Sequence, residues 1–139
     1  MEDGNYQSLL KKAYENEKVA SLACTKLYFN ASISRFYYSI LQRMYYVIYT
    51  TNPSYQPPDK NSHEEAFNEF RNIALKNINM NDYKSLLKFP DLKRRRLEAD
   101  YSTKEFSHDL FTNEFYQSYI NCKRVVDLLV NKYGGKIYG

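Results

Sequence analysis

The longest regular pattern of apolar and aromatic positions lies between residues 30 and 48. Apolar side chains recur there at alternating intervals of three residues and one, which is typical of a helix with one wide buried face. Asn30 stands where an N-cap residue is expected. A face this continuous must meet apolar faces from several partners, so we expect the central helix of a bundle. The positions that carry the pattern are Ile33, Phe36, Tyr37, Ile40, Leu41, Met44, Tyr45 and Ile48.

A second apolar stripe precedes this segment and predicts a helix over residues 5–27, with apolar positions from Tyr6 to Leu27. The link at residues 28–30 is short. We therefore expect the first helix and the central helix to be antiparallel neighbours.

The only Pro-rich stretch of the chain, residues 53–61, follows the central helix and is predicted to be a loop. Its length favours a simple crossover over a mobile functional segment. Ser62 and Glu65 then have the spacing of a capping box, in which the two side chains would cap a third helix. That helix carries Phe67 and Phe70 on its inner face.

The C-terminal half contains three further helical segments. A short helical turn is expected at residues 82–88, and a helix at 90–101 opens with a proline. A long last helix is expected from residue 105 or 107 to residue 133, where Gly134 provides a left-handed stop. Because no strand pattern is found, we predict one all-α domain over residues 1–139, an up-and-down four-helix bundle with an additional short helix.

Composition limits the classes of function. The net charge of +4 permits an anionic partner without requiring one. The 15 tyrosines, with no tryptophan, are expected at the edge of the core or at an interface. Cys24 and Cys122 lie in helical patterns and are expected to be buried free thiols. No signal peptide or membrane span is recognisable, so we expect a cytoplasmic protein.

The strongest chemical feature is the basic run Lys93, Arg94, Arg95 and Arg96. Four consecutive residues cover just over one helical turn, so at least one guanidinium must face the core and needs a carboxylate. The run would bind the phosphates of RNA or of a nucleotide. The alternative is a solvated face with one structural ion pair.

Arg35 and Arg43 form a second candidate group, since they lie two turns apart on the central helix. Arginine interleaved with Tyr37 and Tyr38 can stack nucleic-acid bases. The alternative, which we favour, is that the arginine stems pack on the bundle and the charged heads reach water.

The two histidines, His63 and His108, have no cysteine or histidine partner at metal-ligand spacing, so we expect no metal site and no cofactor. The sequence also lacks a phosphate-binding glycine loop and every common nucleophile motif. An enzyme class is therefore not indicated by motifs.

Three segments in order resemble HEPN domains, a family of nucleotide-associated helical bundles. Residues 31–40 (ASISRFYYSI) resemble the Arg, aromatic, Tyr-Tyr signature of the family's second helix, and residues 62–67 (SHEEAF) resemble its third. Residues 95–101 (RRLEADY) resemble the Arg-x-x-x-Asp-Tyr segment before the last helix. The resemblance implies a homodimer in a bacterial or phage defence or toxin–antitoxin module, some of which pair with a nucleotidyltransferase.

Many HEPN proteins are ribonucleases whose active site is an Arg followed by a His four to six residues later. This chain departs from that pattern, because no Arg precedes a His at that spacing. If RNA is cleaved, we expect Arg95 or Arg96 to stabilise the phosphate, with proton transfer by Asp100, Tyr101, His63 or His108. Binding residues would be Arg94, Arg35, Tyr37, Tyr38 and His63.

Two other functions remain open. The tyrosine-rich faces would suit a non-catalytic protein–protein module, used for dimerisation or as a scaffold. A small-ligand pocket lined by tyrosines and closed by the Pro-rich loop is the third hypothesis.

Overall fold

A computed structural model of the chain describes residues 3–136. All regular structure in that range is helical, which confirms the predicted all-α class. The elements are α1 (Asp3–Thr25), α2 (Phe29–Thr51), α3 (Ser62–Ala74), α4 (Met80–Leu86), α5 (Phe89–Tyr101), α6 (His108–Phe111), the π-helical turn η1 (Thr112–Tyr116) and α7 (Gln117–Lys132).

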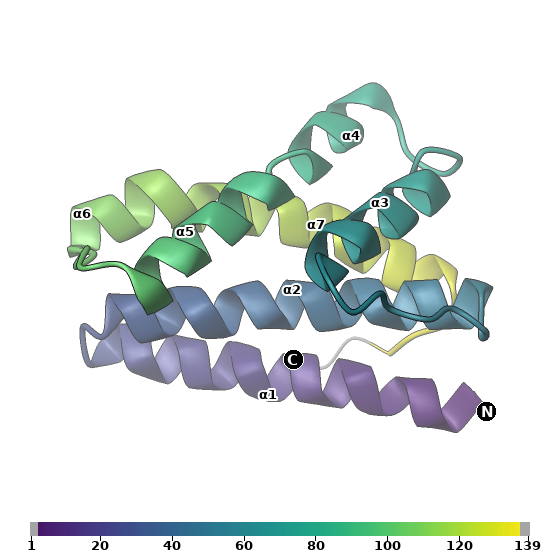
Figure 1. The fold of residues 1–139 in the computed structure, drawn as a ribbon, viewed down its shortest axis with the longest axis horizontal. Coiled ribbons are helices and arrows are strands. Elements are labelled where there is room, and N and C mark those ends of the chain that lie inside the picture. Colours follow the sequence, from purple (N-terminus) through teal and green to yellow (C-terminus); the bar gives the residue numbers. More distant parts are fainter. Residues whose placement is uncertain (1–2, 137–139) are drawn as a thin grey trace.

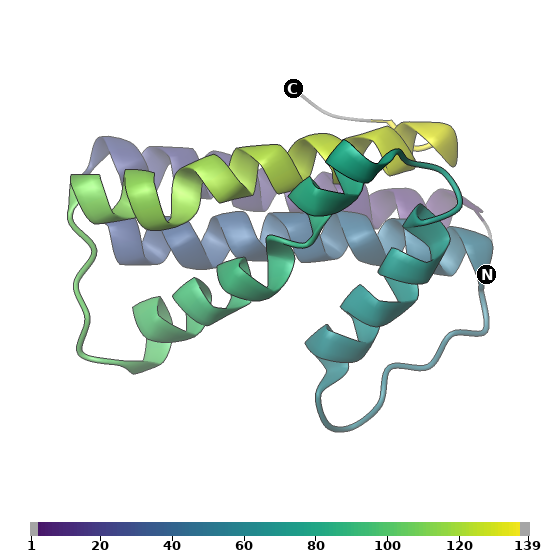
Figure 2. The same ribbon diagram turned by 90° about the horizontal axis from the view of Figure 1, so that it is seen from above.

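The predicted up-and-down bundle consists of α1, α2, α5 and the continuous rod formed by α6, η1 and α7 (Figure 1). The short helix α4 and the 13-residue α3 are inserted between α2 and α5. Seen from above, α3 and α5 lie on the same side of α2, with α5 toward the end of the bundle that carries α6 and α3 toward the other end (Figure 2). No helix in residues 3–136 combines the length and apolar character needed to cross a membrane.

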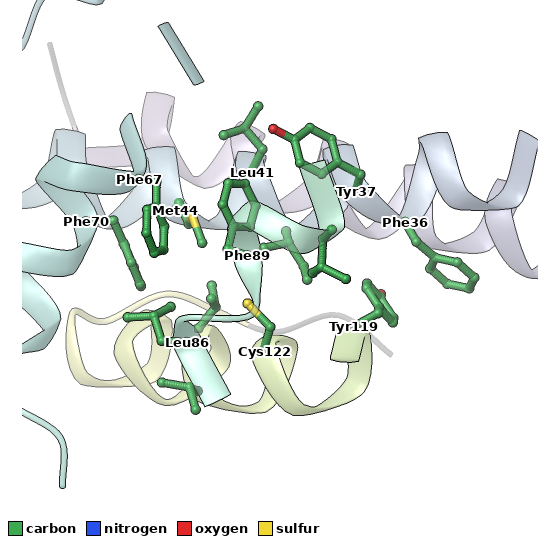
Figure 3. Packing of buried hydrophobic residues seen from close by; sticks show 14 of the residues in the cluster. Phe36, Tyr37, Leu41, Met44, Phe67, Phe70, Leu86, Phe89, Tyr119 and Cys122 are labelled. Carbon is green, nitrogen blue, oxygen red and sulfur yellow. The ribbon is translucent and has the colours of Figure 1, made fainter. Parts of the chain in front are cut away.

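The predicted inner face of α2 is buried at every position except Tyr45, which is partly exposed. Phe89 of α5 lies between the rings of Tyr37 and Phe67, with both centroid distances at 5.2 Å. This stack joins α2, α3 and α5, and it belongs to the same core as Cys122 and Tyr119 of the last helix (Figure 3). The aromatic stack therefore fixes where α3 and α5 lie on α2.

Arg43 is also buried in α2, with 3% of its surface exposed. Its guanidinium lies 2.5 Å from Glu17 of α1 and 3.2 Å from Asp127 of α7. The expectation that this arginine reaches the surface is wrong, because two carboxylates on neighbouring helices compensate its charge inside the bundle.

Asn30 is not the N-cap of α2, since the cap position is Tyr28 and no side chain caps this end. The Asn30 amide instead donates to the carbonyl oxygens of Ala99 and Lys104, at 3.1 and 2.8 Å. Its Oδ1 accepts the backbone N–H of Phe106 at 2.8 Å. These three bonds hold the end of α5 and the following link against α2, which a capping role would not allow.

Two other local predictions at helix ends are wrong. Ser62 is the first residue of α3 and not its cap, because Asn61 occupies the cap position in a left-handed conformation without a side-chain bond. The capping box with Glu65 is therefore not formed. Leu27 lies beyond the end of α1, is 71% exposed and has a positive φ of 63°, because the turn into α2 takes it out of the apolar stripe.

The last helix has the predicted extent, with Ser107 as its cap: the Ser107 hydroxyl accepts the Leu110 N–H. It ends at Lys132, and Gly134 just beyond the cap residue Tyr133 has a φ of 81°, the expected left-handed stop. Both cysteines are free: Cys122 is buried and Cys24 is partly exposed. Burial raises the pKa of the Cys122 thiol far above its usual range, so this thiol stays protonated and inert.

We expect Arg43→Met to lower the free energy of unfolding by about 2–3 kcal/mol. Removing one partner of a buried pair costs ~3–5 kcal/mol, and here the two carboxylates left behind are still partly hydrated. Urea denaturation measures the effect. The matched control is Arg35→Met on the same helix, where the exposed side chain should cost less than about 0.5 kcal/mol. Equal losses in both variants would contradict a structural role specific to Arg43.

Candidate functional site

Arg96 of α5 is the buried member of the basic run, with 6% of its surface exposed. Its guanidinium lies over three tyrosine rings, at 5.2 Å from the centroid of Tyr37, 5.4 Å from that of Tyr38 and 5.8 Å from that of Tyr101. Tyr37 is fully buried, whereas Tyr101 is 76% exposed. The cation therefore stands between the core and the surface.

The hydrogen-bonding capacity of Arg96 is only partly used. Its one carboxylate partner, Asp100, lies 3.6 Å away, and Asp100 also accepts a bond from Ser34. The buried Arg96 Nε has no hydrogen-bond partner among the described residues. The expectation that one guanidinium of the run faces the core and pairs with a carboxylate is thus confirmed.

His63 of α3 reaches the same cluster from the other side. Its Nδ1 lies 3.0 Å from the Tyr37 hydroxyl, and its ring meets that of Tyr38 edge-on at 5.9 Å. Burial lowers the pKa of His63, and the positive charges of Arg96 and Lys93 lower it further. Burial raises the pKa of Tyr37. Near pH 7 the imidazole is therefore neutral and the phenol protonated, so the phenol can donate to Nδ1.

The remaining arginines of the run are neutralised on the protein. Arg94 pairs with Asp91, and Arg95 pairs with Glu98 at 2.9 Å and with Glu114 at 3.5 Å. Glu98 and Glu114 also hold Lys104, whose Nζ lies 3.6 Å from Glu98 and 2.7 Å from Glu114. Arg94, Arg95, Arg96 and Lys104 thus face Asp91, Glu98, Asp100 and Glu114, and the four charges of each sign balance.

Uncompensated positive charge lies instead in a pocket of about 260 Å³ between α3 and α5. Lys93 and Arg71 line it, and neither forms an ion pair with any residue of the described chain. The Arg71 guanidinium lies over the Phe67 ring at 5.8 Å. The rest of the lining consists of His63, Phe89, Asn68, Pro90 and Glu64. Glu64 is the one carboxylate among the lining residues.

The other predicted site residues lie elsewhere. Arg35 is exposed on the side of α2 that faces α1, where it donates to Asn16 at 3.2 Å. His108 is exposed at the start of α6 and contacts Phe29 and Asp109. The site that the structure brings together therefore includes Arg96, Asp100, Tyr101, Tyr37, Tyr38 and His63, but not Arg35 or His108.

Arg71 is the functional candidate that the sequence analysis missed. It occupies the same face of α3 as His63 and Phe67, at spacings of eight and four residues. A helical face with one histidine, one aromatic ring and one arginine was the available signal. Arg71 has no adjacent cation in the sequence, so it is less conspicuous than the basic run at residues 93–96.

No group of three or more histidine, cysteine, aspartate or glutamate side chains in residues 3–136 is placed to hold a metal ion. No protein-family model matches the sequence, and neither the curated proteins nor the solved structures gave a significant match. The site therefore has to be interpreted from its own geometry.

We expect the NMR titration of His63 to have a midpoint below the usual value of about 6.5. In Lys93→Met the midpoint should rise, because one neighbouring positive charge is removed. The neutral form is the one that the fold favours. Stability from His63 is therefore complete above the unfolded pKa and decreases as the pH falls from about 6.5 toward the lower folded value. His63→Gln should flatten this decrease, and a His63 midpoint above 6.5 would contradict the assigned environment.

Proposed function

We propose that the chain binds RNA or a nucleotide by its phosphate groups in the pocket between α3 and α5. The observation that carries this proposal is that Arg71 and Lys93 line the same pocket, which has aromatic walls. Neither cation has a carboxylate partner in the described chain. Cations bind phosphates, and aromatic rings stack bases. His63 lies in the same lining, where burial lowers its pKa and the charges of Arg96 and Lys93 lower it further.

The proposal moves the binding site from the middle of the basic run to its first residue. Arg94 and Arg95 are already paired with Asp91, Glu98 and Glu114, so a phosphate would compete with existing ion pairs there. Lys93 has no such competitor. Arg96 is not part of the pocket lining. Its positive charge acts on His63, and its guanidinium lies over the rings of Tyr37 and Tyr38.

The HEPN resemblance supplies the biological setting of this proposal. It supports a homodimeric protein of a bacterial or phage defence or toxin–antitoxin module, with a nucleotidyltransferase-type antitoxin as one kind of partner. Many members of that family cleave RNA without a metal, but this chain lacks their Arg and His spacing, so cleavage would require a site built from other residues. If RNA is cleaved, His63 would act in the tautomer whose Nδ1–H donates to the Tyr37 oxygen, because Nε2 is then free to accept a proton. Arg96 would stabilise the negative charge that develops on the phosphate.

A protein–protein module is the second candidate function, and one surface favours it. Leu22, Leu27 and Tyr28 are each at least 65% exposed where α1 turns into α2. Leu27 also borders an apolar pocket of about 370 Å³ that Phe29 and Phe111 line. Clustered apolar exposure of this kind is typical of interfaces.

We expect Lys93→Met and Arg71→Met each to weaken binding of a fluorescein-labelled single-stranded RNA at least about tenfold, since one charge-assisted hydrogen bond contributes roughly 1.5–3 kcal/mol. Fluorescence anisotropy at several salt concentrations measures this. The slope of log affinity against log salt should become shallower by about 0.7 for each phosphate that the variant no longer neutralises.

Arg94→Met is the matched control, because it removes a cation of the same run that Asp91 already neutralises. Its RNA affinity should stay within about twofold of the native protein. If all three variants bind RNA equally well, or if affinity does not depend on salt, the phosphate pocket is wrong and the interface candidate takes its place.

For cleavage, we expect RNA incubated with the protein and EDTA to be cut, and the rate to fall about 100-fold or more in His63→Gln, as for loss of a general base. Gel electrophoresis of the labelled RNA measures the rate. His108→Gln is the control, since that histidine lies outside the cluster. Equal rates in both variants would show that His63 does not transfer the proton.

A further inference from the structure

A second pocket, of about 410 Å³, lies where the loop after α2 passes the beginning of α1. Tyr6 of α1 and Tyr49 of α2 form one part of its lining, and Pro53, Tyr55 and Pro57 of the loop form another. The size falls within the range of small-molecule sites. The sequence hypothesis of a tyrosine pocket closed by the Pro-rich loop thus has a physical counterpart, which we call the tyrosine pocket.

The rings of the tyrosine pocket are arranged as a corner. Tyr6 and Tyr49 are nearly parallel, with centroids 5.9 Å apart and 9° between their planes. Tyr55 stands across Tyr49 at 6.0 Å and 72°. Tyr45 stacks on Tyr49 from behind at 5.9 Å and so supports its ring. Two perpendicular aromatic walls suit a flat ligand, which can stack on one ring and meet the other with its edge.

Two phenol hydroxyls in this lining are buried and lack a hydrogen-bond partner among the described residues, those of Tyr6 and Tyr55. Tyr6 itself is 4% exposed. An unpaired buried hydroxyl is unfavourable, and nearly all such groups in proteins are satisfied. The pair therefore points to a ligand that has its own donors and acceptors.

The charge around the pocket limits the chemistry of that ligand. No side chain of the lining carries a charge. On the adjoining surface, Tyr55 borders Glu65, Glu69 and Lys60. Burial raises the pKa of Tyr55, and the two glutamates raise it further. The negative potential of the glutamates disfavours a phosphate or carboxylate, while the absence of an acidic group in the lining leaves a cation without a partner.

We propose that the tyrosine pocket binds a small, neutral, flat aromatic molecule with hydrogen-bonding atoms along one edge. The ligand stacks on Tyr55 and meets Tyr49 with its edge, since Tyr6 and Tyr45 already stack on Tyr49. Its polar atoms reach toward the hydroxyls of Tyr6 and Tyr55. Pro53 and Pro57 cover it from the loop side. This site is separate from the phosphate pocket and does not depend on RNA binding.

The test uses three probes of one shape and different charge, namely benzamide, benzoate and benzamidinium, titrated into the full chain by NMR. Benzamide should bind most tightly. Tyr49→Leu and Tyr55→Leu should each weaken its binding about tenfold, which corresponds to the removal of one aromatic wall. Tyr101→Leu, at the exposed tyrosine of α5, is the control and should bind benzamide like the native protein.

Tyr6→Phe separates a binding role from a structural one. It removes a buried hydroxyl that has no partner among the described residues, so thermal stability should stay the same or rise, while benzamide affinity should fall severalfold. Lys93→Met should leave benzamide binding unchanged, which keeps this result independent of the phosphate pocket. The proposal is overturned if no probe binds, if benzoate or benzamidinium binds more tightly than benzamide, or if the three tyrosine pocket variants bind benzamide like the native protein.

Discussion

The structure depends on one helix that is enclosed by the others. α1, α3, α5 and α7 all pack on α2, so its side chains must be complementary to four partners at once. Apolar and aromatic residues meet most of this demand, and Arg43 meets the rest by pairing with Glu17 of α1 and Asp127 of α7. Such a pair contributes less to net stability than to alignment, because desolvation offsets much of the Coulomb attraction. The ion pairs of Arg43 align Glu17 of α1 and Asp127 of α7 with the same turn of α2.

The candidate site is continuous with this core, because the two share Tyr37. Tyr37 is fully buried and stacks on Phe89, yet its hydroxyl meets His63 and its ring lies beside Arg96. The same residue therefore belongs to the packing and to the polar cluster. Because rigid packing fixes the ring, the imidazole and the guanidinium are held at a constant separation without a direct bond between them.

The helical pattern predicted most of the fold, because residues 33–48 leave only one way to bury their apolar face. Helix ends were less predictable. Asn30 and Ser62 have good capping chemistry, but tertiary bonds to Ala99, Lys104 and Phe106 employ the first, and a left-handed Asn61 displaces the second. The site was predictable only in part. Sequence adjacency favoured Arg94 and Arg95, whereas the neutralising Glu114 comes from a distant helix.

The π-helical turn η1 has a consequence for the way the last helix meets α2. A π turn contains one residue more than an α turn, so residues five apart lie on the same face there. Each residue of an α-helix turns it by roughly 100°, so residues five apart would lie about 140° apart around the axis. Phe111 and Tyr116 are five residues apart, yet their rings lie 5.3 Å from each other and both contact Phe36, at 6.4 and 5.7 Å. Deletion of the exposed Asn113 would leave the two rings four residues apart in a regular α turn, still on one face, so α6 and α7 keep their places. The π turn thus keeps α6 and α7 in register on α2 despite the additional residue, although the sequence has no glycine or proline there to mark it.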